Sequence, residues 1–275
     1  FGDAAVKIEK SVSRGEFARR FTASNDLFHH GRRGPLASVN FIAAHDGFTT
    51  ADFSAFDKKR NHGNGENNHD GRDDEIAAVV PQAERARVRR SLLATLLLAQ
   101  GTPMLLAGDE FANSQQGNNN AYNQDNPSGW LDWAQADREL MAFVQCVLLL
   151  RREEPALRHA RWFAHSPAPT GERSVVWLAP SGQDMQVHDW HDAAQHAFAC
   201  RIDAAPKSAS DGVRANGVGC RHLLIAFNPE TTPTLFTLPA GDWRIALDSS
   251  GELCAVRPHK PLCVPARSLI VLRAL

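Results

Sequence analysis

The chain has 275 residues, with 30 Lys+Arg against 31 Asp+Glu, which gives a formal net charge of −1. This balance excludes a polybasic nucleic-acid-binding protein and a chain organised around an acidic tail. Apolar residues make up 43% of the sequence, which is enough for a packed core and too many for an intrinsically disordered chain. Because the first residue is Phe1 and not Met, we expect the chain to be part of a longer polypeptide.

The first half alternates short apolar segments with helical patterns. Residues 39–44 form an apolar run typical of a buried strand, and residues 82–100 form a helical pattern with Glu84 in its first turn. A second short buried strand is predicted at residues 104–107. A second helix is predicted up to about Arg152, with Asp137 as its N-cap. The order strand, helix, strand, helix predicts parallel strands covered by helices.

Two long polar segments follow the two predicted strands. The first polar loop is residues 47–75 and the second polar loop is residues 108–132, and both are rich in Asn, Asp, Gln and Gly. Because parallel strands end at the same edge of a sheet, we expect the two loops to lie on one side of the molecule. Amide and carboxylate groups suit a neutral polyhydroxyl ligand, whose hydroxyls both donate and accept hydrogen bonds. An anionic ligand would favour Arg, Lys or a glycine-rich helix start.

The same oxygen-rich segment permits a calcium site as an alternative. Its candidate ligands alternate along the first polar loop and are Asn64, Glu66, Asn68, Asp70 and Asp73. Their spacing does not match a calcium-binding loop that ends in a distal Glu, so we predict no metal. Residues 73–75 are interpreted as a solvated run of charge.

The predicted strand at residues 39–44 leads directly into His45 and Asp46, and Gly47 then permits a turn. A carboxylate and an imidazole at the carboxyl end of such a strand face the ligand site of an α/β barrel. The alternative is that the pair only caps the loop. Trp130 and Trp133 are equally compatible with stacking on a ligand and with packing between loop and helix.

The second half begins near Arg161 and has the pattern of an antiparallel β-sandwich. Its apolar segments, separated by Pro and Gly, are residues 174–178, 222–227, 234–238, 243–247 and 268–272. Residues 204–219 are small and polar, which predicts a mobile surface loop. Core packing is favoured over a sugar platform for Trp177, Trp190 and Trp243.

The five cysteines are an odd number and contain no Cys-x-x-Cys pair. A disulfide framework and a zinc ribbon are therefore poor fits, and a reducing compartment, the cytoplasm, is predicted. Cys146 lies in an apolar helical run and is predicted to be a buried thiol.

Four segments together resemble the glycogen debranching enzymes of the bacterial isoamylase type, in the α-amylase superfamily of glycoside hydrolases. These segments are residues 39–49 (VNFIAAHDGFT), 64–71 (NGENNHDG), 97–110 (LLAQGTPMLLAGDE) and 115–133 (QQGNNNAYNQDNPSGWLDW). The resemblance covers roughly residues 15–155. After Asp74 the sequence lacks a Trp-Asn-Cys-Gly stretch that family members often carry, and Glu75 leads almost directly into the helix.

The resemblance implies roles for individual residues. Asp46 matches the third catalytic carboxylate of the family, which stabilises the oxocarbenium-like transition state, and His45 matches the neighbouring sugar-binding histidine. Further substrate-binding residues implied in the two loops are Asn64, Glu66, Asn67, Asn119, Asn120, Tyr122 and Asp125. Nothing before residue 39 resembles the regions of the nucleophile and the general acid, so both are expected to lie outside this chain.

The resemblance further implies the fold and the function. Residues 1–158 are expected to form the C-terminal part of a (β/α)8 TIM barrel, and residues 159–275 an antiparallel β-sandwich. The expected activity is the retaining hydrolysis of α-1,6 branch linkages in limit dextrins. The expected partners are a branched α-glucan and the missing N-terminal part of the barrel, without cofactor, nucleic acid or membrane. The alternatives are a non-catalytic α-glucan-binding fragment, another α-amylase-superfamily hydrolase or transferase, and a calcium-dependent structural module.

Overall fold

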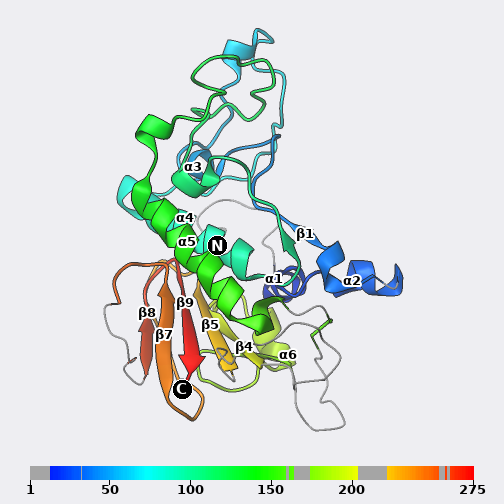
Figure 1. The fold of residues 1–275 in the computed structure, drawn as a ribbon, viewed down its shortest axis with the longest axis vertical. Helices are drawn as coiled ribbons and strands as arrows, with labels where there is room; N and C mark the ends of the chain where they lie inside the picture. Colours follow the sequence, from blue (N-terminus) through cyan, green and yellow to red (C-terminus); the bar gives the residue numbers. More distant parts are fainter. Residues whose placement is uncertain are drawn as a thin grey trace.

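The computed structural model describes residues 13–31, 33–158, 161–163, 174–203, 222–253, 258 and 261–275. In the first half, helices alternate with two very short strands, and two long polar segments rise above them (Figure 1). The elements of this half are α1 (Arg14–Phe21), α2 (Asn25–Phe28), β1 (Val39–Asn40), α3 (Thr50–Phe53), α4 (Gln82–Leu98), β2 (Thr102–Pro103) and α5 (Arg138–Glu153), with short 3-10 helices between them.

The second half is built from antiparallel strands. Its elements are β3 (Val175–Leu178), α6 (Val187–His191), β4 (Phe198–Asp203), β5 (His222–Asn228), β6 (Thr234–Phe236), β7 (Trp243–Asp248), β8 (Leu262–Val264) and β9 (Ser268–Ala274). Five strands form one sheet in the order β3-β4-β5-β9-β7, and β6 pairs with β8 in a second sheet. All pairings in both sheets are antiparallel, as the sequence predicted.

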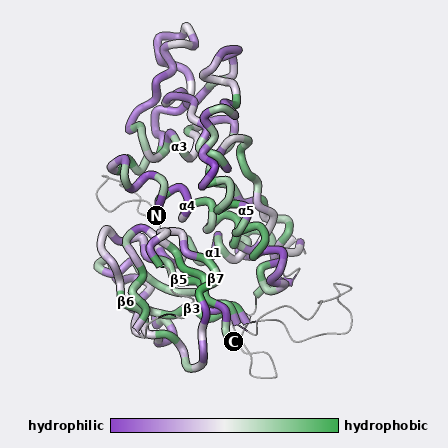
Figure 2. Tube along the Cα trace, turned by 60° about the vertical axis from the view of Figure 1, so that its left-hand side comes forward, coloured by the Kyte–Doolittle hydropathy of each residue, from purple (hydrophilic) through white to green (hydrophobic). Residues whose placement is uncertain are grey.

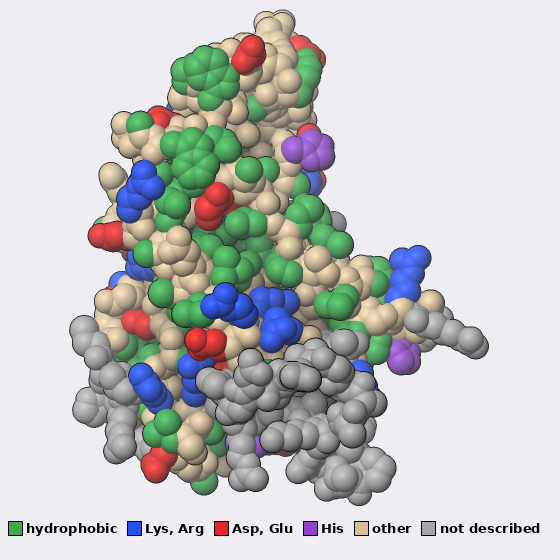
Figure 3. Space-filling view, viewed as in Figure 1, with side chains coloured by type: hydrophobic (Ala, Val, Ile, Leu, Met, Phe, Trp, Pro, Cys, Tyr) green, Lys and Arg blue, Asp and Glu red, His purple; other side chains and the backbone are tan. Residues whose placement is uncertain are grey.

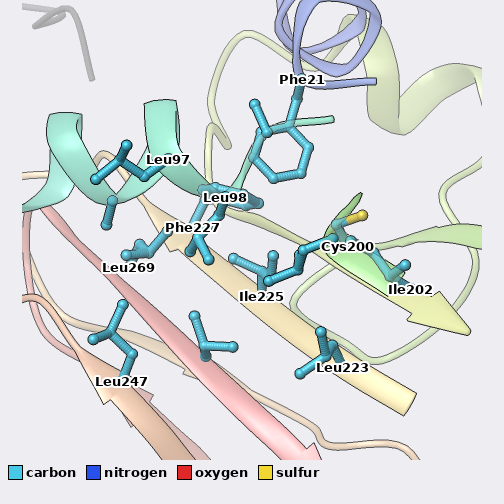
Figure 4. Close-up of a cluster of buried hydrophobic side chains, with 14 of the residues drawn as sticks. Phe21, Leu97, Leu98, Cys200, Ile202, Leu223, Ile225, Phe227, Leu247 and Leu269 are labelled. Carbon is cyan, nitrogen blue, oxygen red and sulfur yellow. The ribbon is translucent and has the colours of Figure 1, made fainter. Parts of the chain in front are cut away.

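Both faces of the five-stranded sheet are buried. Alternate residues such as Ile225 and Val271 face a cluster that includes Leu97 and Leu98 of α4 (Figure 4). The intervening residues, such as Leu224, face a second cluster that contains side chains of β6 and β8. Because successive side chains of a strand point to opposite faces, burial of both faces requires continuous apolar strands. The sequences LLIAF in β5 and SLIVL in β9 meet this requirement.

The two long helices lie between the sheet and the polar loops. The N-cap of α5 is Asp137, whose side chain accepts a hydrogen bond from the backbone N–H of Leu140, as the sequence predicted. Near the C-terminal end of α5, the buried guanidinium of Arg151 donates to the backbone oxygens of Leu97 (2.7 Å), Ala99 (2.8 Å) and Gly101 (2.8 Å). These are carbonyls at and beyond the end of α4 that the helix itself leaves without donors. One charged side chain thus ties the end of α4 to α5.

The two predicted buried strands of the first half are shorter and more exposed than expected. The structure has β1 at Val39–Asn40 and β2 at Thr102–Pro103, which pair in parallel. The predictions of buried strands over 39–44 and 104–107 are therefore wrong, since Val39 is 53% exposed and Phe41 56% exposed. Among the described residues each strand has only the other as a neighbour in the sheet, so each leaves one edge unpaired, and an isolated two-stranded pair is marginal in water.

The burial predicted for Cys146 is also wrong, because this cysteine is exposed. The buried positions of α5 include Leu140, Val144, Val147 and Leu150, which recur at helical spacing on the face toward the sheet. Cys146 lies off this face. Two strands of the sheets, β4 and β8, were not predicted from the sequence. The loop predicted at residues 204–219 lies outside the described residues.

Hydropathy separates the two ends of the molecule. The polar loops are hydrophilic, whereas the hydrophobic residues gather in the strands and in parts of the long helices (Figure 2). Some apolar side chains nevertheless remain at the surface, and Figure 3 shows them on one face. On α5 these include Leu148 and Leu149, 45% and 44% exposed. Within the described parts of the chain, no helix combines the length and the apolar character needed to cross a membrane.

Replacement of Arg151 by Met should remove three hydrogen bonds while keeping an apolar stem of similar length. The buried carbonyls at the end of α4 would lose charged donors, so we expect the free energy of unfolding to fall by about 3 kcal/mol. Urea unfolding measures the change. The exposed neighbour Arg152 supplies the control, and Arg152→Met should change stability by less than about 0.5 kcal/mol. Equal effects of the two substitutions would contradict the role assigned to Arg151.

Candidate functional site

The two polar loops lie against each other, as predicted, and a pair of buried asparagines joins them. Asn61 Nδ2 donates to Asn119 Oδ1 at 2.8 Å, and the backbone N–H of Asn119 donates to Asn61 Oδ1 at 3.0 Å. Asn119 Nδ2 also donates to the backbone oxygen of Arg72 at 3.0 Å and to Glu75 Oε2 at 2.8 Å. Both asparagines are at most 1% exposed. Their mutual pairing avoids the cost of burying unpaired amides.

A second group of amides surrounds the carboxylate of Asp70. Its Oδ2 accepts hydrogen bonds from Asn64 Nδ2 at 2.6 Å and from Asn120 Nδ2 at 3.0 Å. Burial opposes ionisation of Asp70, but these amide hydrogen bonds hold the pKa of its carboxyl below the usual value. Asn64 also donates to the backbone oxygen of Asn120 and accepts from Asn118 Nδ2 and Gln124 Nε2, each at 2.8 Å. All the donor and acceptor positions of the Asn64 amide are therefore occupied.

Two buried carboxylates connect the short helix α3 to the second polar loop. One belongs to the loop and accepts hydrogen bonds from α3, and the other belongs to α3 and accepts hydrogen bonds from the loop. Asp109 Oδ1 accepts from the backbone N–H of Thr50 at 2.9 Å and from its hydroxyl at 3.0 Å. Asp52 accepts from the Ser114 hydroxyl at 2.5 Å and from the backbone N–H of Gln115 at 2.8 Å. Burial raises the pKa of Asp109 to about 6 although the bonds from Thr50 lower it, and burial also raises the pKa of Asp52.

Asp46 differs from these acids because its carboxylate is open to solvent. Its side chain is 67% exposed, and Oδ2 lies 3.5 Å from Nε2 of His45, which is itself 89% exposed. The next residue, Gly47, donates its backbone N–H to the backbone oxygen of Asn119 at 2.8 Å. The turn that carries His45 and Asp46 is therefore attached to the second polar loop, while both side chains remain free to meet a ligand.

The other exposed residues predicted to bind substrate lie in the same two loops. The Tyr122 hydroxyl of the second polar loop donates to Glu66 Oε1 of the first at 2.5 Å. Asp125 Oδ1 accepts from the indole N–H of Trp130 at 3.0 Å. The rings of Tyr122 and Trp130 are 67% and 54% exposed, and Asn67 is exposed as well. The carboxylates of Glu66 and Asp125 thus accept hydrogen bonds from the hydroxyl of Tyr122 and the indole N–H of Trp130, and part of each aromatic side chain remains in solvent.

The structure gives the predicted residues two different environments. His45, Asp46, Glu66, Asn67, Tyr122 and Asp125 are exposed, Asn120 is partly buried, and Asn64 and Asn119 are buried. Both amides are buried and bond across the two loops, and in Asn64 every donor and acceptor position is occupied. The structure therefore places Asn64 and Asn119 in the contacts between the loops, and their direct contact with substrate stays a prediction.

Several residues that define the site were not singled out in the sequence as site residues. Asn61 and Asn118 supply loop contacts, and Asp52 anchors α3, while Asp70, considered only as a candidate calcium ligand, accepts from Asn64. Glu75, interpreted as part of a solvated charge run, instead accepts from Asn119. Only Asp52 had a sequence pattern that could have indicated its role. It is an acid three residues after Thr49, which can cap a helix, and it lies between the apolar residues Ala51 and Phe53. The rest resemble the solvated polar residues around them.

Burial and ring contacts place the tryptophans of the second half in or against the core, while the two alternatives for Trp130 and Trp133 stay open. Trp177 and Trp243 are buried, as core packing predicts, and Trp190 packs partly buried with its ring centroid 6.0 Å from that of Trp177. Trp133 packs against Phe111 with ring centroids 4.5 Å apart and is still 53% exposed.

The calcium alternative finds little support in the arrangement of the first polar loop. Asp70 Oδ2 faces amide N–H donors, which occupy the positions that a cation would take. Asp73 pairs with Lys59 Nζ at 2.7 Å. In the part of the chain that the structure describes, no group of three or more His, Cys, Asp or Glu side chains is arranged to hold a metal ion.

The fold is found within pullulanases. A pullulanase from Anoxybacillus sp. LM18-11, solved in complex with maltotriose, superposes with a TM-score of 0.64 and 18% identity over 95% of this chain and 30% of that one. The likeness defines the class of fold.

Sequence comparison is more specific. The chain is 41% identical over 256 residues to the glycogen debranching enzyme of Serratia proteamaculans, covering 89% of this chain and 35% of that protein. It is 37% identical over 286 residues to a glycogen operon protein GlgX homolog of Mycobacterium bovis, covering 94% and 39%. No protein-family model matches the sequence. The chain is thus similar to bacterial glycogen debranching enzymes, as its motifs predicted, and spans about a third of their length.

The raised pKa of Asp109 predicts a pH-dependent stability. Because the folded-state pKa of about 6 exceeds the ordinary value of 3.8, the fold favours the protonated acid. Its contribution to stability therefore falls as the pH rises from about 4 to 6, by up to about 3 kcal/mol, and stays low above that range. Asp109→Asn keeps an acceptor for Thr50 and cannot ionise, so its stability relative to the parent should rise over this range.

Urea unfolding at pH 4.5 and pH 7.5 measures this difference for the parent and the Asp109→Asn variant. Asp57→Asn, at an exposed acid of the first polar loop, serves as the control and should leave the pH profile unchanged. Parallel profiles for the parent and the Asp109→Asn variant would contradict the assignment of this pH dependence to Asp109.

Proposed function

We propose that this chain is part of a retaining glycoside hydrolase that cleaves α-1,6 branch linkages in glycogen-derived limit dextrins. The relationship to glycogen debranching enzymes over 89% of the chain supports the substrate class and the reaction. A retaining mechanism needs a nucleophile and a general acid, two carboxylates that flank the scissile bond. Because no segment before residue 39 resembles the regions that carry them in the family, we assign both to residues outside this sequence. This chain contributes Asp46 and the loops around it.

One observation carries the role of Asp46. It is an acid with a freely exposed carboxylate beside a group of amides and acids that are mostly buried and paired. An exposed carboxylate can accept hydrogen bonds from the hydroxyls of a glucosyl ring. Hydrogen bonds that strengthen as the ring flattens toward an oxocarbenium ion stabilise the transition state more than the bound substrate, and so raise kcat.

The remaining exposed residues supply binding. His45 stands beside Asp46 and can contact the same sugar, while Glu66 and Tyr122 meet across the two loops. The Tyr122 ring offers a face on which a sugar can stack, and Asn67 and Asp125 offer acceptors for hydroxyls. The complex of the Anoxybacillus pullulanase with maltotriose supports an α-glucan as the ligand class.

We further propose that the first half is the end of a (β/α)8 barrel. The order β1, α4, β2, α5 with a parallel β1–β2 pair is that of two successive strand–helix units. The exposed apolar residues Val39, Phe41 and Met104 would be covered by preceding strands and helices of the barrel. Residues 1–158 would form this part, and residues 159–275 a β-sandwich whose two sheets pack face to face.

We also propose that the protein is located in the cytoplasm. The odd number of cysteines, five, favours a reducing compartment over one that builds a disulfide framework. The described thiols are the free cysteines Cys146, Cys200 and Cys263.

Replacement of Asp46 by Asn in the enzyme that contains this chain tests the proposed role. The substitution removes the negative charge at the sugar, so we expect kcat on a branched limit dextrin to fall by about 10²-fold or more. The side chain makes little contact with the fold, and the melting temperature should change by less than about 2 °C. Turnover close to that of the parent would refute the role of Asp46.

An assay of the 275-residue chain by itself tests the proposal that the nucleophile and the general acid lie outside it. Without a nucleophile and a general acid it should release no linear chains from a branched dextrin. Reducing-end assays over a long incubation measure this, with an active debranching enzyme as the positive control. Sustained release by the purified chain would mean that the catalytic pair lies within it.

A further inference from the structure

The position of the Asp46 carboxylate is set through its backbone. Among the described residues its one ion-pair partner is the exposed His45, at 3.5 Å, which cannot fix a side chain that is two-thirds exposed. A group that stabilises a transition state must nevertheless be held to within about 0.5 Å of its productive position. The turn formed by Asp46 and Gly47 must therefore be held by its surroundings.

Gly47 makes one hydrogen bond that holds this turn, and the Glu75 carboxylate lies close beside it. Its backbone N–H donates to the backbone oxygen of Asn119 at 2.8 Å. Its φ of +105° is a conformation that side chains rarely adopt, and a Cβ at this position would lie 3.3 Å from Glu75 Oε1. Asn119 therefore anchors Gly47 by a hydrogen bond, and the Glu75 carboxylate lies on the side of Gly47 that a Cβ would occupy, so that a side chain there would crowd it.

Glu75 and Asn119 also contact each other. Glu75 Oε2 accepts from Asn119 Nδ2 at 2.8 Å, while Oε1 is the carboxylate oxygen nearest Gly47. One carboxylate thus bonds to the residue that anchors the turn and lies beside the turn that carries Asp46. Asn119 keeps other partners in Asn61 and in the backbone oxygen of Arg72. Removal of Glu75 would leave Asn119 in place but would loosen the support of Gly47.

We propose that Glu75 is a positioning residue that, together with Asn119, holds the Asp46–Gly47 turn so that the Asp46 carboxylate meets the substrate. This inference rests on the proposed function of Asp46. Glu75 is only partly buried and belongs to no helix or strand. Its substitution should therefore change catalysis more than stability. A misplacement of about 1 Å can reduce a rate by about 10²-fold.

Two substitutions at Glu75 distinguish whether kcat depends on the support that its side chain gives the turn or only on its negative charge. Glu75→Ala removes the bond from Asn119 and empties the space beside Gly47, so it should lower kcat on a branched limit dextrin by about 10-fold to 100-fold, with KM changed by less than about 3-fold. Glu75→Gln keeps an oxygen that can accept from Asn119, so kcat should stay within about 3-fold of the parent. The exposed Asp57→Ala is the control and should leave both constants unchanged.

A double-mutant cycle tests whether Glu75 acts through Asp46. In an Asp46→Asn background, the carboxylate that Glu75 positions is already gone, so Glu75→Ala should lower the residual kcat by less than about 2-fold. The same fractional loss in both backgrounds would overturn the inference, because Glu75 would then act independently of Asp46. An unchanged kcat in the Glu75→Ala single variant, or equal losses in the Ala and Gln variants, would overturn it as well.

The cycle also distinguishes this inference from the proposed function. If Asp46→Asn turns over normally, the role of Asp46 fails and the inference fails with it. If Asp46→Asn loses activity but Glu75→Ala does not, only the inference fails. Melting temperatures verify that each variant folds. If Glu75→Ala does not fold, Glu75→Asp takes its place in the cycle, since the shorter side chain withdraws the carboxylate from both Gly47 and Asn119.

Discussion

Polar side chains taken out of water must find partners, and this requirement organises the end of the molecule that carries the candidate site. The two polar loops contain little regular secondary structure, so their backbone and side-chain groups cannot be satisfied by ladders of helix or strand. They satisfy one another instead, through pairs such as Asn61 with Asn119 and Asn64 with Asp70. Because each of these bonds depends on the others being in place, the loops hold a defined shape without a hydrophobic core of their own.

This constraint divides the polar residues into two groups with different roles. Buried amides and acids such as Asn119 and Asp109 use their hydrogen-bonding capacity inside the protein, while Asp46 and Tyr122 keep theirs directed to solvent. A ligand of the proposed kind would meet the second group and depend on the first for its geometry. Many of the amide and carboxylate side chains that suit sugar recognition are thus used to hold the two loops together.

The long helices and the sheet give these loops a rigid base. The five-stranded sheet is apolar on both faces, and α4 packs on one of them through Leu97 and Leu98. Arg151 joins the end of α4 to α5 and thereby fixes the segment that leads into β2 and the second polar loop. The first half and the sheet share one continuous core, so the site rests on the whole molecule rather than on an isolated lobe.

The sequence by itself determined the two long helices, the antiparallel second half and the family resemblance. Periodic leucines, the Asp137 cap and the motif around Asp46 are local signals that need no knowledge of distant residues. It could not determine that Phe41 is exposed, nor that Asn64 and Asn119 face inward while Glu66 and Tyr122 face outward. An asparagine in a polar loop has the same local pattern whether its amide meets water or another loop. Only the tertiary structure, which brings Asn61 and Asn119 together from 58 positions apart, decides which.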